Sequence, residues 1–421
     1  AIHKDEESMA NNSDFTITNI ERWRLNVPFH ERCAHTTDIR VPGWSVVDLY
    51  RVSLASGALG VGETLDNYTW GSIEDDGATA HIGGNAMDLM WQDKLGAGLQ
   101  MAIFDAVGQT AKVPIHRLLG DQHREACPVS WWAQDMAPRL WAAEAAAAEA
   151  AGFTTMKVKA RPWFDIEDQL EAVSEATSDH FQLDADFNGL LLGVDHAAPL
   201  LRRLEETFPV LAIIESPIPQ DDVAGNAALR KKIASPIAMH FGSPPVMTAI
   251  REGVCDGFVI GGGASTVMSQ GTLAGHAKMP FWLQMVGTGL TTTFAAHLGA
   301  VLPQARWPAI PCINIYSHTL LTEFEISGGH LQVPDAPGLG VEVDWEAVEG
   351  FRVADDFTRP APREIHTIHW PDKRLSHYPD GSYRQDFLDG KLPGFLPGVR
   401  LERGLDDGSD DFDRRYKELF G

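Results

Sequence analysis

Short apolar runs recur through the middle of the chain, and each is followed by a segment whose apolar residues have helical spacing. The eight runs are residues 127–132, 154–159, 181–186, 211–215, 237–240, 257–260, 281–285 and 311–315. Strands that alternate with helices predict a parallel sheet, and eight such repeats indicate a (β/α) barrel. A doubly wound sheet is the main alternative, but no G-x-G-x-x-G motif follows the first run.

The pattern differs on either side of these repeats. Residues 14–28 and 46–54 alternate apolar and polar positions, as half-buried strands do, and residues 85–119 have helical spacing. The first third of the chain therefore predicts an α+β unit. Residues 359–421 show little periodicity before 412–420, which predicts an extended carboxy-terminal arm.

The predicted fold class is α/β, a modified TIM barrel with an α+β amino-terminal domain and an extended carboxy-terminal arm. On that arm we expect His366, His369 and His377 at the surface, because their spacing is irregular. The expected divisions are a disordered leader (1–13), the α+β domain (14–125), the barrel (126–325) and a return segment with the arm (326–421).

Charge and composition exclude several classes of partner. The 421 residues include 34 Lys+Arg and 58 Asp+Glu, a formal net charge of −24. This charge repels phosphate backbones and anionic lipids, so we expect no nucleic-acid or membrane partner. The four cysteines form no C-x-x-C pair, and no apolar run approaches the ~20 residues of a membrane-spanning helix. The polar, acidic start lacks a secretory signal, so we expect a cytoplasmic protein.

Two lysines end the second apolar run, in the sequence Lys157-Val158-Lys159. Residues two apart on a strand share a face, so both ammonium groups point the same way. Their repulsion, together with partial burial, lowers a lysine pKa and produces a base that works near neutral pH. The alternative is a solvated strand end.

The next three runs end in residues that bind metals. Asp186 ends the third run, Glu215 the fourth and His240 the fifth. A carboxylate at the end of an apolar strand is costly to bury unless it is paired or bound to a metal. Neighbouring strands would bring these three side chains around one point, where oxygen and nitrogen ligands suit a divalent cation. Individually, each residue is also explained as a helix cap or a loop salt bridge.

With these strand-end residues and several further motifs, the sequence resembles the enolase superfamily, in the branch of mandelate racemase and muconate lactonizing enzyme. The resemblance covers roughly residues 14–342. Its motifs are Gly60-Val61-Gly62-Glu63, the helix at 102–108, the K-x-K of Lys157 and Lys159, the D-x-N-G at 186–189 and the I-E-S-P at 214–217.

The resemblance implies that the α+β domain caps the mouth of the barrel. It also implies a divalent metal, usually magnesium, held by Asp186, Glu215 and a third ligand from strand five. The family's third ligand is normally Glu or Asp, whereas the matching position here holds His240. Because imidazole removes one negative charge and softens the site, manganese, iron or zinc are alternatives to magnesium.

The family's chemistry is removal of the proton next to a substrate carboxylate, with the enediolate stabilised by the metal. Lys159 would be the base, and Lys157 would lower its pKa. We assign substrate binding to Arg161, Asn188, Gln284 and His35. Specificity is expected from the cap loops at 28–43 and 67–84.

The sequence departs from the family on the opposite face of the substrate. Many relatives place an Asp after strand six and a His after strand seven, and the lactonizing enzymes use a lysine on strand six. Here these regions read Ile260-Gly261-Gly262 and Leu283-Gln284-Met285, with no ionisable pair. The leaving group would therefore need the metal, His30 or His35 as its acid.

Chemistry on a single face favours dehydration of a sugar acid after proton removal by Lys159. A one-base epimerase or racemase of a hydroxy acid is the alternative, and a barrel that binds a ligand without turnover is the third. The expected partner is a small carboxylate, and we expect a homo-oligomer from family habit and the arm.

Overall fold

The computed structural model describes residues 11–65, 68, 70–71 and 75–421. Most of the predicted disordered leader lies outside this range, and Asn12–Phe15 forms a short 3₁₀ helix, η1. Within the described part of the chain, no helix combines the length and apolar character needed to span a membrane.

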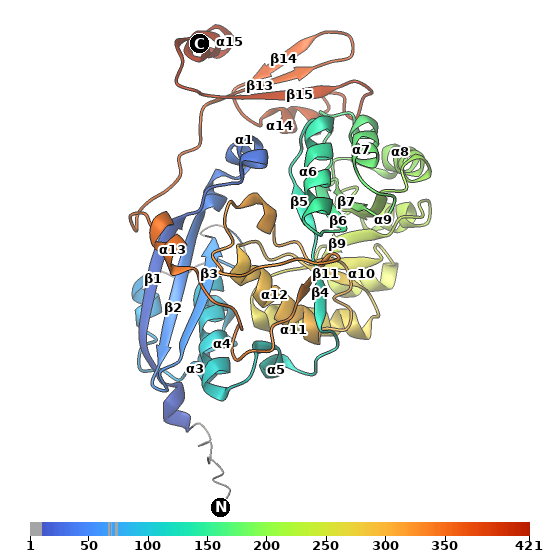
Figure 1. The fold of residues 1–421 in the computed structure, drawn as a ribbon. Helices are drawn as coiled ribbons and strands as arrows, with labels where there is room; N and C mark the ends of the chain where they lie inside the picture. The colour runs from blue at the N-terminus through green and yellow to red at the C-terminus, as the bar shows by residue number, and fades with distance from the viewer. Residues whose placement is uncertain (1–10, 66–67, 69, 72–74) are drawn as a thin grey trace, which may run out of the picture.

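The amino-terminal domain is an antiparallel sheet covered by helices, drawn in blue in Figure 1. Its strands are β1 (Ile17–Asn26), β2 (Val46–Leu54) and β3 (Leu59–Leu65), in that spatial order. The helical elements are α1 (Glu31–Arg40), η2 (Pro42–Ser45), α2 (Asp75–Thr79), α3 (Ala86–Leu89), η3 (Asp93–Leu95), α4 (Ala97–Ala111) and α5 (Ile115–Leu119). The sheet packs on α4, which is buried along most of its length.

Two glycines of the G-V-G-E motif make this packing possible. A Cβ on Gly60 would lie 2.0 Å from the carbonyl oxygen of Ala102, and one on Gly62 would lie 2.2 Å from that of Gly98. Both clashes involve the backbone of α4, which cannot move aside as a flexible side chain can. The motif therefore requires glycine for the close approach of strand and helix.

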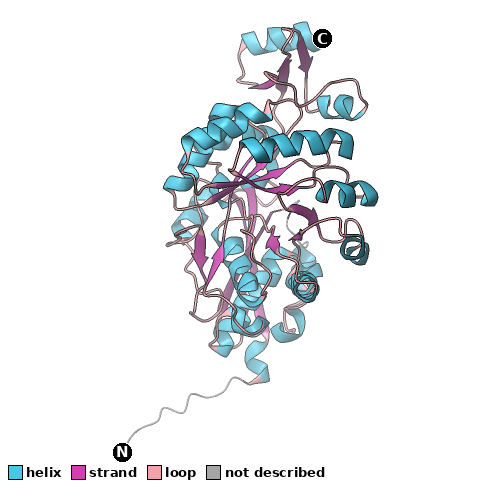
Figure 2. Cartoon of the chain, turned by 90° about the vertical axis from the view of Figure 1, so that its right-hand side faces the viewer, coloured by secondary structure: helices cyan, strands magenta, loops and turns pink. Residues whose placement is uncertain are grey.

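The middle of the chain forms a parallel sheet of seven strands, shown in magenta in Figure 2 with helices around it. The strands, in spatial and sequence order, are β5 (Trp131–Ala133), β6 (Thr155–Lys159), β7 (Gln182–Asp186), β8 (Leu211–Glu215), β9 (Ile237–His240), β10 (Gly257–Ile260) and β11 (Phe281–Leu283). The intervening and following helices are α6 (Pro138–Ala150), α7 (Ile166–Ala176), α8 (Val194–Thr207), α9 (Val223–Arg230), α10 (Val246–Glu252), α11 (Ala264–His276) and α12 (Gly289–Val301). This alternation confirms the predicted α/β fold class with an amino-terminal α+β cap.

The first and last predicted strands differ from the structure. The first run divides into β4 (Ala126–Pro128), which pairs with β12 (His330–Gln332), and the barrel strand β5. The predicted eighth strand at 311–315 is instead a 3₁₀ turn, η4 (Ile313–Ile315). Only two bridges close the sheet there, Ala309 to Val129 and Ile310 to Gln284. Prolines at positions 308 and 311 explain the short contact, because proline donates no hydrogen bond to a neighbouring strand.

The carboxy-terminal segment folds into a sheet where an unpatterned arm was expected. The segment first returns to the cap, where α13 (Trp345–Phe351) packs on β1. It then forms a three-stranded sheet that lies beside α1 at the top of Figure 1. Its elements are β13 (Glu364–His369), β14 (Leu375–Tyr378), α14 (Tyr383–Leu388), β15 (Arg400–Leu405) and α15 (Asp410–Phe420).

The carboxy-terminal sheet packs against the barrel through an apolar cluster that is separate from the main core. The cluster contains Trp163, Phe164, Ile368, Trp370, Tyr383, Val399 and Leu401. The surface position predicted for His366 is wrong, because its side chain is buried and contacts Glu364 Oε2 at 2.5 Å and Tyr383 Oη at 3.2 Å. The sequence pattern hides this strand because histidine and glutamate fill inward-facing positions that alternation rules expect to be apolar.

Candidate active site

The ends of β6, β7 and β8 lie in a single register. Lys159 ends β6 and pairs with Asp186 at the end of β7, which in turn pairs with Glu215 at the end of β8. His240 ends β9, two positions beyond Ala238, the register partner of Glu215. The structure thus brings these four side chains to the same edge of the barrel sheet.

The Lys157 ammonium lies between the two strand-end carboxylates. Its Nζ forms an ion pair with Glu215 and lies 3.8 Å from Asp186 Oδ2. It also donates a hydrogen bond of 2.8 Å to Gln284 and lies 5.1 Å from the ring centre of Trp282. Burial acts against its charge, but Glu215 and Asp186 hold the pKa of Lys157 above its ordinary value. Lys157 is therefore a fixed cation in this site.

Lys159 is the more accessible of the two lysines. Its side chain is 19% exposed, against 1% for Lys157. Its Nζ lies 2.6 Å from Asp186 Oδ2 and 3.5 Å from Asn188 Oδ1. Burial lowers the pKa of Lys159, and the charge of Lys157 lowers it further, while Asp186 opposes the change. A lysine of this kind releases its proton more readily than one in water.

Arg161 lies next to this lysine, in the loop after β6. Its Nη1 donates to the carbonyl oxygens of Ala160 and Asp186 at 2.9 Å each, and its Nη2 donates to Asn188 Oδ1 at 2.5 Å. All three acceptors are neutral, although the residue is only 7% exposed. Asn188 has a left-handed backbone (φ 45°), and its N–H donates to Asp186 Oδ1. The D-x-N-G turn thus holds Arg161 and Lys159 side by side.

The three predicted metal ligands do not surround a common point. His240 Nε2 lies 3.2 Å from Glu215 Oε1, whereas the ammonium of Lys157 lies between Glu215 and Asp186. Among the residues that the structure describes, no group of three or more His, Cys, Asp or Glu side chains is arranged as a metal site. The metal assignment stays a prediction.

The chemistry of these donors nevertheless fits a divalent cation. Asp186 and Glu215 are fully buried on adjacent strands, and the Glu215 carboxylate contacts Lys157 and His240. A metal ion would compete with the Lys157 ammonium for Glu215.

Gln284 and Tyr68 close the inner side of the site. Gln284 follows β11, accepts from Lys157 and donates to the Tyr68 hydroxyl at 3.0 Å. Burial raises the pKa of Tyr68, and the hydroxyl stays protonated. Tyr68 belongs to the predicted specificity loop 67–84, parts of which lie outside the described residues. Nothing in the sequence around Tyr68 marks it as a site residue.

The two cap histidines contact other groups. His35 is exposed, and its Nε2 lies 2.9 Å from the carbonyl oxygen of Arg403 on β15. His30 caps the start of α1, and its ring contacts the guanidinium of Arg32. The substrate-binding role predicted for His35 stays untested, and neither contact joins these histidines to Lys159.

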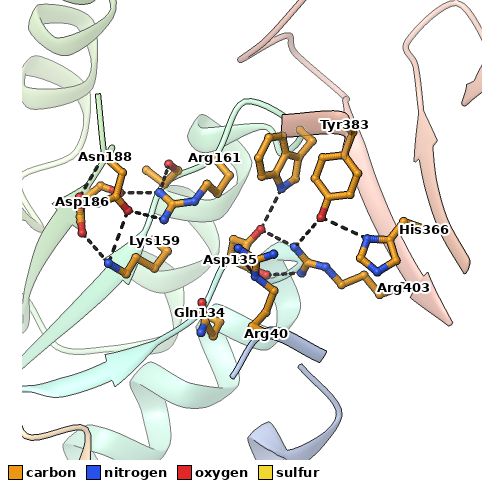
Figure 3. Close-up of polar contacts among 12 residues, drawn as sticks. Arg40, Gln134, Asp135, Lys159, Arg161, Asp186, Asn188, His366, Tyr383 and Arg403 are labelled. Atoms are coloured by element: carbon orange, nitrogen blue, oxygen red, sulfur yellow. Dashed lines mark hydrogen bonds and ion pairs between the residues drawn. The ribbon is translucent and has the colours of Figure 1, made fainter. Parts of the chain in front are cut away.

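A second polar cluster adjoins the lysines and was missed by the sequence analysis (Figure 3). Asp135 follows β5, is fully buried and forms an ion pair with Arg403. It also accepts a hydrogen bond of 2.8 Å from Trp163, and Arg40 Nε lies 3.5 Å from its Oδ1. The strand-end rule that selected Asp186 would also have selected Asp135. Nothing in the pattern pointed to Arg403, which lies far along the chain.

Two acidic residues of the family motifs have structural roles. Glu63 is fully buried and accepts hydrogen bonds from the backbone N–H groups of Thr288 and Thr291, at 2.7 and 2.9 Å. It thereby anchors the cap to the start of α12, where a carboxylate is favourable. Asp105 of α4 accepts from the N–H groups of Val61 and Leu339, and burial raises its pKa to about 6.

Comparisons with known proteins agree with this architecture. The family model described as "Enolase C-terminal domain-like" matches residues 141–348. An N-succinylamino acid racemase from Amycolatopsis is 29% identical over 259 residues, covering 58% of this chain and 67% of that protein. An arabinonate dehydratase from Saccharolobus solfataricus is 25% identical over 270 residues, covering 61% and 71%. A dipeptide epimerase from Cytophaga hutchinsonii, solved with Mg and a dipeptide, has a TM-score of 0.63 at 20% identity, covering 80% and 98%.

The capped barrel and its strand-end lysines and carboxylates define the class of protein as a (β/α) barrel of the enolase type. The chain belongs to the enolase superfamily, in the mandelate racemase and muconate lactonizing enzyme branch. Its relatives include racemases, dehydratases and cycloisomerases.

Proposed function

We propose that this protein removes the proton next to a substrate carboxylate, with Lys159 as the base. The observation that carries the proposal is the contrast between the two lysines. Lys157 is buried and held as a cation by Glu215, whereas Lys159 is partly open and has a lowered pKa. A base needs the partly open position and lowered pKa of Lys159, and a group that binds a carboxylate needs the fixed positive charge of Lys157.

The neighbouring residues have complementary roles in this proposal. Lys157 attracts the substrate carboxylate, Arg161 also binds the substrate, and Asn188 fixes the position of Arg161 relative to Lys159. Asp186 and Glu215, with His240, would hold a divalent cation. When bound, such an ion supplies positive charge that stabilises an enediolate.

Dehydration of a sugar acid is the reaction that this arrangement favours. In the described residues at the ends of β10 and β11, Gln284 is the polar side chain that faces Lys157, and an amide does not act as an acid or base. Lys159 supplies a base on one face of the substrate carbon, and loss of a β-hydroxyl after proton removal needs no second base on the other face. The relatedness to arabinonate dehydratase supports this choice.

A one-base racemase or epimerase is the second candidate. The 29% identity to an N-succinylamino acid racemase favours it. In that reaction Lys159 would return the proton to the opposite face of the same carbon, which requires the planar intermediate to turn over between the two transfers.

A substrate panel separates these functions. The purified protein is incubated with aldonic, aldaric and N-succinylamino acids, with and without Mg²⁺ or Mn²⁺, and products are followed by NMR. A 2-keto-3-deoxy acid supports the dehydratase, and a new stereoisomer supports the epimerase. If no substrate exchanges its α-proton, the barrel binds without turnover and the proposal fails. Metal analysis of Glu215→Gln against the wild type tests the cation site independently of activity.

A further inference from the structure

The carboxy-terminal sheet reaches the mouth of the barrel through one arginine. Arg403 of β15 donates to the carbonyl oxygen of Asp135 at 2.7 Å and forms an ion pair with its carboxylate. Its side chain is only 6% exposed. Figure 3 shows two neighbouring sets of contacts, one joining Lys159, Asp186, Asn188 and Arg161 and the other joining Asp135 to Arg403, Tyr383 and His366.

Three arginines from three parts of the fold act on Asp135, two of them through ion pairs. Arg40 comes from the end of α1 in the cap, Arg161 from the loop after β6, and Arg403 from the carboxy-terminal sheet. We call these residues the arginine cluster. All three act on the Asp135 carboxylate and hold its pKa well below the ordinary value, against the effect of burial.

The arginine cluster has more positive charge than its carboxylate can balance. Arg40 and Arg403 form ion pairs with Asp135, and Arg161 lies near it without a direct ion pair. Three guanidinium charges against one carboxylate leave a surplus of two positive charges. The nearby pair of Asp186 and Glu215 cannot supply the difference, because Lys157 and Lys159 already contact them. A surplus of this sign stands out in a chain whose net charge is −24.

Two members of the cluster have unused bonding capacity. The guanidinium of Arg161 donates to neutral oxygens although the residue is 93% buried. Arg40 Nε lies at ion-pair distance from Asp135, 3.5 Å, but forms no hydrogen bond. Arg161 is therefore a buried cation without a hydrogen-bonded anion, which is costly, and an anionic ligand removes this cost. Arginine also matches the planar geometry of carboxylate and phosphate groups.

We propose that Arg40 and Arg161 bind a second anionic group of the substrate, distal to the carboxylate at Lys159, so that the preferred substrate is a hydroxylated diacid. Arg403 is a positioning residue, because its ion pair with Asp135 holds that carboxylate between the other two arginines. This inference rests on the proposed function. It makes the carboxy-terminal sheet a third wall of the active site, beside the cap and the barrel.

Calorimetry with matched acids tests the inference. The Lys159→Met protein is titrated with gluconate and glucarate, which differ by one terminal carboxylate, and with 6-phosphogluconate. This variant lacks the proposed base, and NMR of the recovered acids shows whether they stay intact during the titration, so failure of the proposed function is distinguished from failure of this inference. We expect glucarate to bind about tenfold more tightly than gluconate, as for one charge-assisted contact. Tighter binding of 6-phosphogluconate than of glucarate assigns the second group as a phosphate.

Substitutions at Arg40 link the preference to the cluster. In the Lys159→Met background, Arg40→Met is expected to reduce the diacid preference about tenfold, and Arg40→Lys to retain most of it. Arg251→Met is the control, because Arg251 is 71% exposed and pairs with Glu252 at the surface. Equal affinities for the monoacid and the diacid, a preference that Arg40→Met leaves unchanged, or binding of none of the acids would overturn the inference.

Discussion

Lys157 and Lys159 carry the same ionisable group two residues apart, yet their surroundings shift their pKa values in opposite directions. The ion pair with Glu215 raises the pKa of Lys157 despite burial, whereas burial and the charge of Lys157 lower the pKa of Lys159. The K-x-K spacing alone predicts a shared face and mutual repulsion. The spacing does not predict which lysine has the lowered pKa, because that depends on the burial of each side chain and on Glu215, which lies two strands away.

This difference predicts the pH dependence of proton abstraction. The neutral amine of Lys159 is the active form, so the rate of α-proton exchange rises with pH through the Lys159 pKa and then levels. Because that pKa is lowered, the exchange rate should rise at pH values below 10.5, the ordinary pKa of lysine. A pH–rate profile of exchange in ²H₂O measures it. A rising limb at or above pH 10.5 would contradict the environment described for Lys159.

The elements show where sequence patterns succeed and where they fail. The ends of β6, β7 and β8 could be placed together from spacing, since parallel strands present their carboxyl ends at one edge of a sheet. The apolar run at 311–315 predicted an eighth strand that does not form. The sheet instead closes through two bridges, at Ala309 and Ile310, which lie between two prolines and leave no apolar run to recognise. The strand β13 was missed because its buried positions carry His366 and Glu364.

The contact between β3 and α4 gives a test at this scale. Gly60→Ala places a methyl group against the backbone of α4, and we expect a loss of about 3 kcal/mol or more in the free energy of unfolding. Gly275→Ala is the matched control, since its Cβ would meet no atom within 4 Å in α11, and it is expected to be neutral or slightly stabilising. Urea unfolding measures both. Equal stability of the two variants would show that the close approach is not required.

The molecule as a whole joins three units around one site. Glu63 anchors the cap to α12, and Arg403 anchors the carboxy-terminal sheet to the loop after β5. The barrel and cap were predictable because the family motifs recur in order along the chain. The carboxy-terminal sheet was not, because its contacts with the barrel join residues far apart in sequence, as Arg403 and Asp135 are.

Asp135→Asn tests this assembly. The substitution removes the carboxylate and leaves Arg403 almost wholly buried without its ion pair, so we expect a loss of about 3 kcal/mol in the free energy of unfolding. We also expect faster hydrogen exchange in β13 and β15. Asp372→Asn, which affects an exposed pair with Arg374, is the control and should leave both measurements unchanged. Protection in β13 and β15 that is the same in all three proteins would argue against the anchoring role of Asp135.

Exchange of the substrate α-proton with ²H₂O, followed by NMR, tests the central claim most directly. The wild type is compared with Lys159→Met and with Lys232→Met, which alters an exposed lysine outside the barrel mouth. We expect Lys159→Met to slow exchange at least about 100-fold while Lys232→Met exchanges at the wild-type rate. Exchange by Lys159→Met at the wild-type rate would contradict the assignment of Lys159 as the base.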